Sequence, residues 1–172
     1  AVVVDAEGYH AALRTSEANL RDIVSALHDG VLVLSADRLE MANPAALELL
    51  GCSLAELQDP ATFEAFDSIR TDGSPIAFED RAPIVAMRTR RPVSDEVVGM
   101  LLPRRGRRWF SVNARPRLAD GRVIGAVLTF SDITERKEAE DRLRDSEARF
   151  RTLAESLPVG VYWAGADGHL LY

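Results

Sequence analysis

The segment GRVIGAVLTFSDITERK, residues 121–137, carries a strand and the beginning of a helix in direct succession. Arg122 to Ser131 alternates apolar side chains with polar or small ones, and this period of two is typical of a strand with one buried face. Asp132 is followed three residues later by Glu135, which is the spacing of a capping box that begins a helix and fixes its direction. The segment therefore predicts a last strand that passes into a helix at a set angle.

Two further strands are predicted immediately before this segment. They run from Val93 to Leu102 and from Arg107 to Arg115, and Arg105-Gly106 supplies the turn between them. Asp120-Gly121 supplies the turn into the last strand. The C-terminal half of the domain is therefore predicted to be an antiparallel meander.

A hairpin and a helix are predicted near the N-terminal side of the domain. The short apolar runs Val31 to Ala36 and Arg38 to Ala42 have the alternation of paired strands. Asn43 followed by Pro44 predicts the beginning of a helix that continues to Leu50, because Asn accepts hydrogen bonds from first-turn amides and Pro tolerates the first helical position.

The middle of the chain is predicted to hold short helices and loops. Ser53 is the expected cap of a helix from Leu54 to Leu57, and Arg81 to Arg91 reads as another helix. Ala61 to Asp80 mixes apolar residues with breakers, so we expect turns of helix and loop there. Two strands, short helices, three strands and a final helix predict an α+β fold with one five-stranded antiparallel sheet.

The chain also repeats itself. Residues 13–37 and 143–167 share eleven identities in twenty-five ungapped positions, at a spacing of 130 residues. An internal repeat of domain length indicates a tandem array. The predicted organisation is an N-terminal helix over residues 1–28, with 1–8 as the tail of an upstream segment, a core over 29–134, a linker helix over 135–157, and the start of a second, truncated copy over 158–172.

Both flanking helices carry apolar residues at heptad spacing. The pattern favours a parallel coiled coil between identical chains, although an amphipathic helix lying on its own domain has the same pattern. The seam positions are Tyr9, Leu13, Ser16, Leu20, Ile23 and Leu27 in the first helix and Ala139, Leu143, Ser146, Phe150, Leu153 and Leu157 in the second. The residues predicted to carry a homodimer are Leu13, Leu20, Ile23, Leu27, Leu143 and Phe150.

The composition predicts a soluble, cytoplasmic chain. Hydrophobic residues make up 47% and charged residues 28% of the sequence, as in ordinary folded domains. No apolar run approaches the roughly 18 residues that span a bilayer, and the N-terminus lacks the basic region of a signal peptide. The lone Cys52 excludes an intramolecular disulfide, and the net charge of −6 argues against general nucleic-acid binding. We therefore expect neither a membrane nor a nucleic-acid partner for this fragment.

Several segments together resemble a PAS domain with its C-terminal PAC motif, followed by the beginning of a second PAS domain. They are Met41-Ala42-Asn43-Pro44-Ala45-Ala46, Arg107-Arg108-Trp109-Phe110, Gly125, Ser131-Asp132-Ile133-Thr134-Glu135-Arg136-Lys137 and Ser146-Glu147-Ala148-Arg149-Phe150-Arg151. The resemblance implies a five-stranded sheet with helices on one face, enclosing a small hydrophobic pocket, in bacterial sensor kinases, cyclase-type regulators or phosphatases.

By the strand parity of that family, inward residues would line the pocket. The predicted ligand-binding residues are Leu34, Met41, Leu49, Met87, Phe110, Val112 and Phe130. Simple core packing accounts for the same apolar pattern. We expect the pocket to be empty or to take an uncoloured small molecule, because the sequence has neither a flavin-type cysteine nor a haem-type histidine. Arg88, Arg90 and Arg91 near the pocket helix leave an apolar or carboxylate compound open, but the favoured interpretation of these arginines is a solvated basic helix end.

The resemblance also implies that an aspartate-threonine corner couples the sheet to the output helix. Asp132, Thr134 and Glu135 are accordingly predicted to relay the signal. A plain N-cap worth about 1 kcal/mol is the simpler interpretation of the same residues.

Cofactor and metal sites are not expected. Cys52 stands in Gly-Cys-Ser-Leu and not in the Asn-Cys-Arg-Phe-Leu-Gln context of flavin photoadducts, and the helix Arg81 to Arg91 lacks the histidine of haem-binding PAS domains. His10, His28 and His169 lie elsewhere and are expected to be solvated.

No catalytic motif is found, so the fragment is predicted not to be an enzyme. The predicted function is a sensory or regulatory module that binds a small ligand or mediates dimerisation and signals to an effector outside the fragment, such as a histidine kinase, diguanylate cyclase or phosphatase. The alternatives are a structural dimerisation module with an empty core, and a nucleic-acid binder that uses Arg104, Arg105, Arg107 and Arg108. The terminal stretch Gly160 to Tyr172 is expected to pair with a neighbouring chain or with exposed sheet surface.

Overall fold

The computed structural model describes residues 6–35, 38–59, 61–62 and 65–156. The chain divides into two compact units, Ala1–Ile133 and Thr134–Tyr172. The first unit holds the sheet with its helices, and the described part of the second is a single helix. The expectation for Gly160 to Tyr172, and the start of a second copy predicted over residues 158–172, lie outside the described residues.

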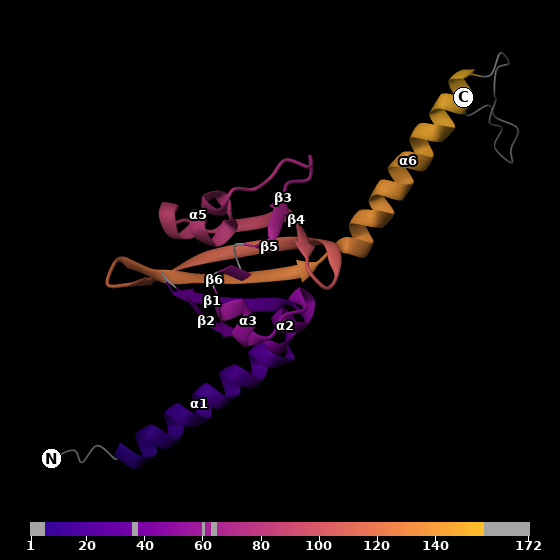
Figure 1. The fold of residues 1–172 in the computed structure, drawn as a ribbon. Helices are drawn as coiled ribbons and strands as arrows, with labels where there is room; N and C mark the ends of the chain where they lie inside the picture. Colours follow the sequence, from indigo (N-terminus) through magenta and orange to yellow (C-terminus); the bar gives the residue numbers. More distant parts are fainter. Residues whose placement is uncertain (1–5, 36–37, 60, 63–64, 157–172) are drawn as a thin grey trace, which may run out of the picture. The chain divides into compact units, whose positions relative to one another are not determined.

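The first unit is built on one antiparallel sheet in the order β2-β1-β6-β5-β4-β3 (Figure 1). The strands are β1 (Gly30–Ser35), β2 (Leu39–Ala42), β3 (Asp67–Ile69), β4 (Val93–Leu102), β5 (Gly106–Ala119) and β6 (Arg122–Asp132). The predicted α+β class is therefore confirmed. The N-terminal hairpin pairs with the last strand, so β1 lies between β2 and β6.

The sheet has six strands instead of the predicted five. The additional strand, β3, pairs with β4 through Asp67↔Leu101 and Ile69↔Gly99. A tight turn follows it, in which the Gly73 amide donates to the Arg70 carbonyl at 3.0 Å. A strand of three residues is too short to show a period of two, which is why this region reads as mixed helix and loop in the sequence.

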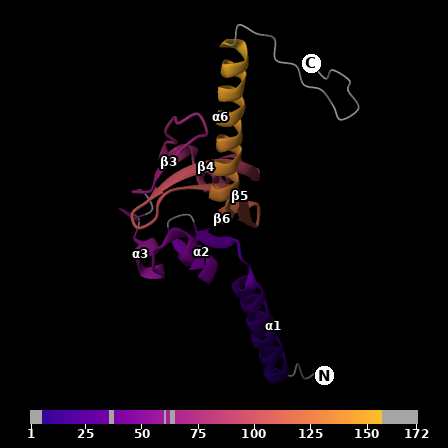
Figure 2. The same cartoon turned by 90° about the vertical axis from the view of Figure 1, so that its right-hand side faces the viewer.

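The helices come before, between and after the strands along the chain (Figures 1 and 2). They are α1 (Ala6–Ala26), α2 (Pro44–Leu50), α3 (Leu54–Gln58), the 3-10 turn η1 (Phe78–Asp80), α5 (Ala82–Thr89) and α6 (Thr134–Ser156). In the part of the chain that the structure describes, none of these helices is long and apolar enough to cross a bilayer.

Two of the three predicted helix caps are confirmed. The Asn43 side chain accepts a hydrogen bond from the Ala46 amide at the start of α2. Ser53 and Glu56 form a reciprocal capping box at the start of α3. Each cap satisfies amides that have no partner within the first helical turn, and the two caps therefore fix where the short helices begin.

The core lies between the inner face of the sheet and the short helices. Its largest fully buried side chains are Leu32, Phe66, Leu102 and Phe110. The Phe110 ring meets the Phe130 ring edge to face, with centroids 5.5 Å apart, which is a favourable arrangement for two aromatic rings. The inner face of the sheet thus supports a dry apolar layer.

Asn43 also connects three elements. Its Oδ1 accepts from the amides of Val31 at 2.8 Å and Ala46 at 2.9 Å, and its Nδ2 donates to the carbonyls of Val24 and Asp29, both at 3.0 Å. Two donors and two acceptors are all that one amide side chain offers, so this buried group is fully satisfied. It holds the end of α1, the start of β1 and the start of α2 together.

Candidate functional site

A small cavity lies inside the apolar core of the first unit. Its volume is about 60 Å³. Its wall comes from the inner face of the sheet, from the segment that contains β3, and from α2 and α5. The lining residues are Leu32, Leu50, Phe66, Ser68, Ile76, Arg81, Ala82, Pro83, Glu96, Val98, Met100, Val112, Leu128 and Phe130.

Val112 and Phe130 are the two predicted ligand-binding residues that line this cavity. Phe110 is fully buried against Phe130 but does not reach the wall. Leu34 and Leu49 pack against the core from partly buried positions. The inward face predicted for β5 and β6 therefore agrees with the structure. The predicted positions on β1 and α2, Leu34 and Leu49, do not line the cavity.

Met41 was wrongly predicted to line the pocket, and its side chain is 37% exposed. The pairing of β1 with β2 is interrupted by a bulge between Val33 and Leu34. Because paired residues share a face, Leu39 opposite Leu34 turns inward, while Met41 opposite Val33 turns to the outer face. A bulge of this kind changes strand parity within two residues.

Met87 does not line the cavity either. In α5 the buried residues are Ala82, Pro83 and Ala86, and Met87 is half-buried. Small residues at the inward positions let α5 approach the sheet closely, so the larger side chain lies at the margin of this contact.

The sequence interpretation missed the polar part of the wall. Ser68, Arg81 and Glu96 line the cavity, and none was proposed as a site residue. Arg81 donates from a terminal guanidinium nitrogen to the Phe66 carbonyl at 2.8 Å, and its guanidinium lies 5.4 Å from the centre of the Phe78 ring. Arg88, Arg90 and Arg91 are exposed and do not line the cavity, as expected for a solvated basic helix end.

Glu96 occupies an inward position on β4. It pairs with Val112, and it shares its face with Val98 and Met100. A register shift separates it from Val93, and the residue just before it, Asp95, has a φ of 54°. A bulge that contains a residue with left-handed backbone conformation changes strand parity and redirects the neighbouring side chains. A prediction that uses only the alternation of apolar and polar residues could not detect this change.

Burial is the main cause of the raised pKa of the Glu96 carboxyl. Arg70 lowers this pKa and Asp80 raises it. Arg70 itself donates to the Pro75 carbonyl at 2.7 Å and lies 3.7 Å from Asp80. The cavity wall thus includes a carboxyl group whose ionised form is disfavoured by its surroundings.

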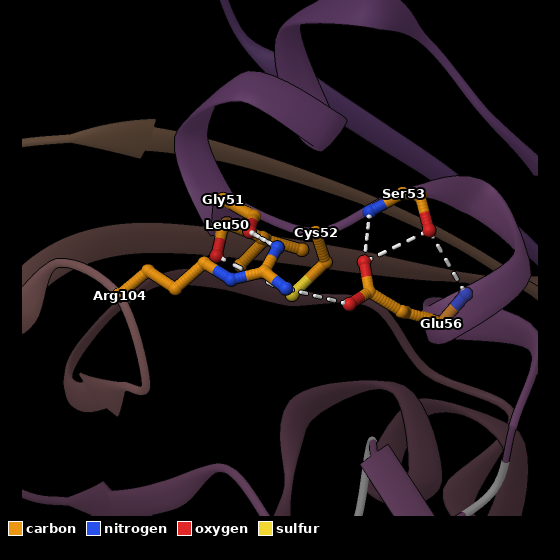
Figure 3. Close-up of polar contacts among 6 residues, drawn as sticks. All are labelled: Leu50, Gly51, Cys52, Ser53, Glu56 and Arg104. Atoms are coloured by element: carbon orange, nitrogen blue, oxygen red, sulfur yellow. Dashed lines mark hydrogen bonds and ion pairs between the residues drawn. The ribbon is translucent and has the colours of Figure 1, made fainter.

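Cys52 lies outside the cavity, beside a separate polar cluster (Figure 3). Arg104 donates to the Gly51 carbonyl at 3.3 Å and to Glu56 at 3.0 Å, so the β4–β5 turn is connected to α2 and α3. Burial raises the pKa of the Cys52 thiol, and Glu56 adds to this effect while Arg104 opposes it. A thiol held protonated in this way is a poor nucleophile.

The predicted relay residues lie at the end of the sheet and the start of the last helix. Asp132 is the final residue of β6, and its carboxylate lies 4.0 Å from Arg108. The Ile133 amide donates to the Trp109 carbonyl at 2.8 Å. Thr134 begins α6, and Glu135 follows in its first turn. The capping box and the relay role stay predictions.

The predicted dimerisation residues are exposed on both flanking helices. On α1, Leu13 is 45%, Leu20 60%, Ile23 62% and Leu27 45% exposed, and on α6, Leu143 is 62% and Phe150 55% exposed. Apolar side chains at this spacing form a seam that a second helix can cover. The homodimer itself stays a prediction.

Residues 6–35, 38–59, 61–62 and 65–156 contain no metal-binding cluster. No group of three or more His, Cys, Asp or Glu side chains within them is arranged to hold a metal ion.

The family of the chain follows from comparison with known proteins. The PAS fold matches residues 24–138, which is 115 of the 172 residues, so the chain belongs to the PAS family. A signalling protein of Caulobacter vibrioides is 30% identical over 149 residues, covering 84% of this chain and 16% of that protein. The two-component sensor PprA of Pseudomonas aeruginosa is 36% identical over 66 residues, covering 38% of this chain and 7% of the sensor.

Solved structures show the same fold. A PAS domain from Colwellia psychrerythraea superposes with a TM-score of 0.53 at 15% identity, covering 69% of this chain and 98% of that one. A sensory box histidine kinase/response regulator from Burkholderia thailandensis gives a TM-score of 0.54 at 20% identity, with 78% and 98% covered. The chain spans less than a fifth of the length of the Caulobacter and Pseudomonas relatives, 16% and 7%.

Proposed function

We propose that this chain is a sensory PAS module that binds a small molecule in its core cavity, dimerises through its flanking helices, and signals through α6 to an effector beyond the fragment. The cavity is the observation that carries the proposal. It lies against β5 and β6, and β6 is followed after one residue by α6.

The path from cavity to helix is short along the chain. Phe130 lines the cavity, and Asp132 ends the same strand two residues later. A ligand that favours one packing of Phe130 over another would shift the end of β6, provided that it binds the two arrangements with different affinity. Asp132, Thr134 and Glu135 would then pass this shift to the helix.

The effector is proposed to be a histidine kinase. The sensor PprA and the Burkholderia histidine kinase/response regulator support this class, because a part of each is similar to this chain. The repeat at 130 residues and the Asp-Ile-Thr-Glu-Arg-Lys segment support a tandem PAS arrangement with a PAC motif. A cytoplasmic location is part of the proposal, since a single cysteine suits a reducing compartment.

The exposed seams support the dimer. Two helices that expose leucine, isoleucine and phenylalanine at heptad spacing keep apolar surface in contact with water unless a partner covers it. This exposure is unfavourable, so covering the surface would stabilise an assembly. Fewer than three heptads give a marginal zipper, so both helices would contribute to one assembly.

A structural dimerisation module with a well-packed core that holds no ligand is the second candidate, and the small volume of the cavity favours it. Drug-sized ligands occupy pockets of roughly 300–1,000 Å³, well above the 60 Å³ found here. Nucleic-acid binding has less support, because Arg104 is engaged with Gly51 and Glu56, and Arg108 lies near Asp132.

Mass spectrometry of small molecules released from the purified, denatured protein tests the sensory proposal. We expect one small, uncoloured compound at a stoichiometry approaching one per chain. Release of nothing, together with unchanged melting temperature across a library of small metabolites, would leave the structural module as the better description.

A further inference from the structure

This inference rests on the proposed sensory function and names the chemical class of ligand that the core cavity takes. Among the described residues that line the cavity, all except Ser68, Arg81 and Glu96 are apolar. The partners of these three polar side chains therefore decide whether the cavity suits a charged or an uncharged molecule.

The polar groups of Ser68 and Arg81 bind to the protein itself. The Ser68 hydroxyl donates to the Phe66 carbonyl at 3.2 Å. Arg81 donates to the same carbonyl at 2.8 Å, and its guanidinium lies 5.4 Å from the centre of the Phe78 ring. A ligand that needs these donors must compete with hydrogen bonds that the protein already makes.

Glu96 contributes to the wall from a half-buried position. The charged groups that act on its carboxyl, Arg70 and Asp80, do not line the cavity and lie 3.7 Å from each other. The charged side chains of the wall are thus engaged with protein groups. A charged ligand would give up its hydration here without a counter-ion dedicated to it.

The rest of the described wall offers van der Waals contact. Leu32, Val98, Val112, Leu128 and Phe130 line it from β1, β4, β5 and β6. An apolar cavity stays dry, because a water molecule inside it finds too few hydrogen-bond partners. The lining atoms of an unfilled cavity lose dispersion contacts, and an apolar occupant restores them.

The volume of the cavity limits the size of the ligand. A water-sized group needs roughly 10–15 Å³ of such space, so a cavity of about 60 Å³ holds about four to six non-hydrogen atoms. A short hydrocarbon has this size, whereas a fatty acid with a long chain does not.

We propose that the cavity binds an uncharged apolar molecule of about four to six non-hydrogen atoms, such as a short hydrocarbon. The binding free energy comes from removing the ligand's apolar surface from water and from its contacts with the wall. Because Val112 and Phe130 belong to the wall, the occupant contacts β5 and β6, and α6 follows β6 along the chain.

Methyl-group NMR on the whole chain tests this proposal with four probes: n-butane, xenon, sodium butyrate and n-butylammonium chloride. Butane, butyrate and butylammonium share a four-carbon chain and differ mainly in charge. Xenon is a small uncharged atom that enters dry apolar cavities. The methyl groups of Val98, Val112 and Leu128 report on the cavity, and those of Val127, which does not line it, are the internal control.

We expect butane and xenon to shift the cavity methyl signals with saturation, and to leave the Val127 signals nearly unchanged. Butane should bind at least tenfold more tightly than butyrate or butylammonium. Either ion binding as tightly as butane would overturn the inference. Equal shifts at Val127 and at the three cavity residues would overturn it too, because the probes would then bind without regard to the cavity.

Two substitutions that add one methyl group to the wall give a second test. Val98→Ile should raise the melting temperature of the ligand-free chain by a few degrees and weaken butane binding at least threefold, because the added group occupies part of the cavity. Val112→Ile should act in the same direction. Val97→Ile is the matched control, since Val97 is the neighbour of Val98 on β4 and does not line the cavity. Butane affinities that are equal in all three variants would contradict the proposed site.

The outcomes separate this inference from the sensory function. Short hydrocarbons are volatile, so compounds released from the denatured protein are analysed in the headspace as well as in solution. A charged compound released at one per chain would overturn the apolar assignment and leave the sensory function standing. If none of the four probes binds, the apolar inference is overturned, and the released compounds still decide the sensory function. If butane binds but hydrogen exchange at the start of α6 is the same with and without it, the ligand class stands and the signalling role is wrong.

Discussion

Ser131 donates a hydrogen bond from its hydroxyl to the Asp29 carboxylate at 2.8 Å, across 102 residues of sequence. Asp29 follows α1, and Ser131 is the penultimate residue of β6. The Asp29 carbonyl in turn accepts from the Asn43 side chain at 3.0 Å. The segment where the chain enters the sheet and the strand where it leaves are therefore connected directly, without passing through the cavity.

Replacing Ser131 with Ala should loosen this connection. The loss of one exposed hydrogen bond to a charged group costs about 0.5–1.5 kcal/mol, which lowers the melting temperature by a few degrees. Hydrogen exchange at the amides of residues 29–31 should accelerate more than exchange in β4. Ser94→Ala is the matched control, since Ser94 is exposed on β4. Equal effects of the two substitutions would contradict the coupling.

Replacing Asn43 with Asp should separate the hydrogen bonds that its side chain accepts from those that it donates. Asp retains the acceptors for Val31 and Ala46 but places oxygen where the amide donates to the carbonyls of Val24 and Asp29. Two buried donors are lost, and we expect a free energy of unfolding lower by about 2–4 kcal/mol. Denaturant melts measure this loss.

The same variant should release the end of α1 while α2 keeps its cap. Hydrogen exchange should therefore rise in the last turn of α1 more than in α2. Asn19→Asp, an exposed position on α1, is the control and should change stability little. Protection that is lost equally in both helices would show that the bonds to Val24 and Asp29 do not hold α1.

Glutamate at Leu20 and Ile23 should convert a dimer to a monomer. These side chains are 60% and 62% exposed and form the centre of the α1 seam. Burying two carboxylates in a coiled-coil seam removes the apolar gain and adds like-charge repulsion. Light scattering should show half the mass with sheet content retained by circular dichroism.

Leu118→Glu is the matched control for that experiment. Leu118 is 53% exposed near the end of β5 and belongs to neither seam. Its substitution should leave the mass unchanged. A mass that does not change in the Leu20 and Ile23 variant would remove the support for helix-mediated dimerisation.

Glu96→Gln should stabilise the protein at neutral pH. The folded-state pKa of this carboxyl is raised, chiefly by burial, with Asp80 adding to the shift, Arg70 opposing it, and Arg81 also on the wall. The folded state therefore binds the proton more tightly than the unfolded chain, and ionisation costs stability as the pH rises through the raised pKa. Glutamine has no such cost.

Thermal melts of wild type and Glu96→Gln across about pH 4 to 8 check this prediction. The variant should melt higher by less than about 5 °C near pH 7.5, since the group is only half-buried. The difference should shrink toward zero below the ordinary value of 4.5. A difference that grows as the pH falls would have the wrong sign.

The purified chain should show no visible absorption band. Cys52 and His28 both lie outside the lining of the cavity. A band between about 400 and 600 nm that persists after gel filtration would indicate a bound chromophore and contradict the uncoloured ligand. The control is the spectrum after denaturation, which should also be featureless above the aromatic band.

Local chemistry could be predicted from the sequence where one or two residues determine the structure. Asn43 and Ser53 cap helices because their side chains accept hydrogen bonds from amides three residues ahead, and this depends on local spacing alone. The five longer strands were predicted for a similar reason, since alternation over several residues is itself the signal.

The residues that line the cavity could not all be predicted from the sequence, because the lining depends on two places where the alternation of inward and outward side chains is interrupted. The bulge at Leu34 reverses the expected face of Met41, and the register shift before Glu96 changes the parity of β4. Both are properties of how two strands pair, and a single strand's sequence does not reveal them.

Gly125 stands out in the sequence, but the sequence does not show why glycine is required at this position. A Cβ at this position would lie 1.9 Å from the Leu34 carbonyl oxygen, and its φ is 154°. The requirement for glycine thus comes from a strand about ninety residues earlier, by the pairing of Ser35 with Gly125.

The strand order has a consequence for how the protein is made. Because β6 lies between β1 and β5, the hairpin of β1 and β2 keeps an open edge until residues 122–132 have left the ribosome. During synthesis the early hairpin must wait for a pairing about a hundred residues away, which is slow compared with local pairing. The strand that closes the sheet is synthesised immediately before α6, so the sheet becomes complete only when α6 begins to emerge.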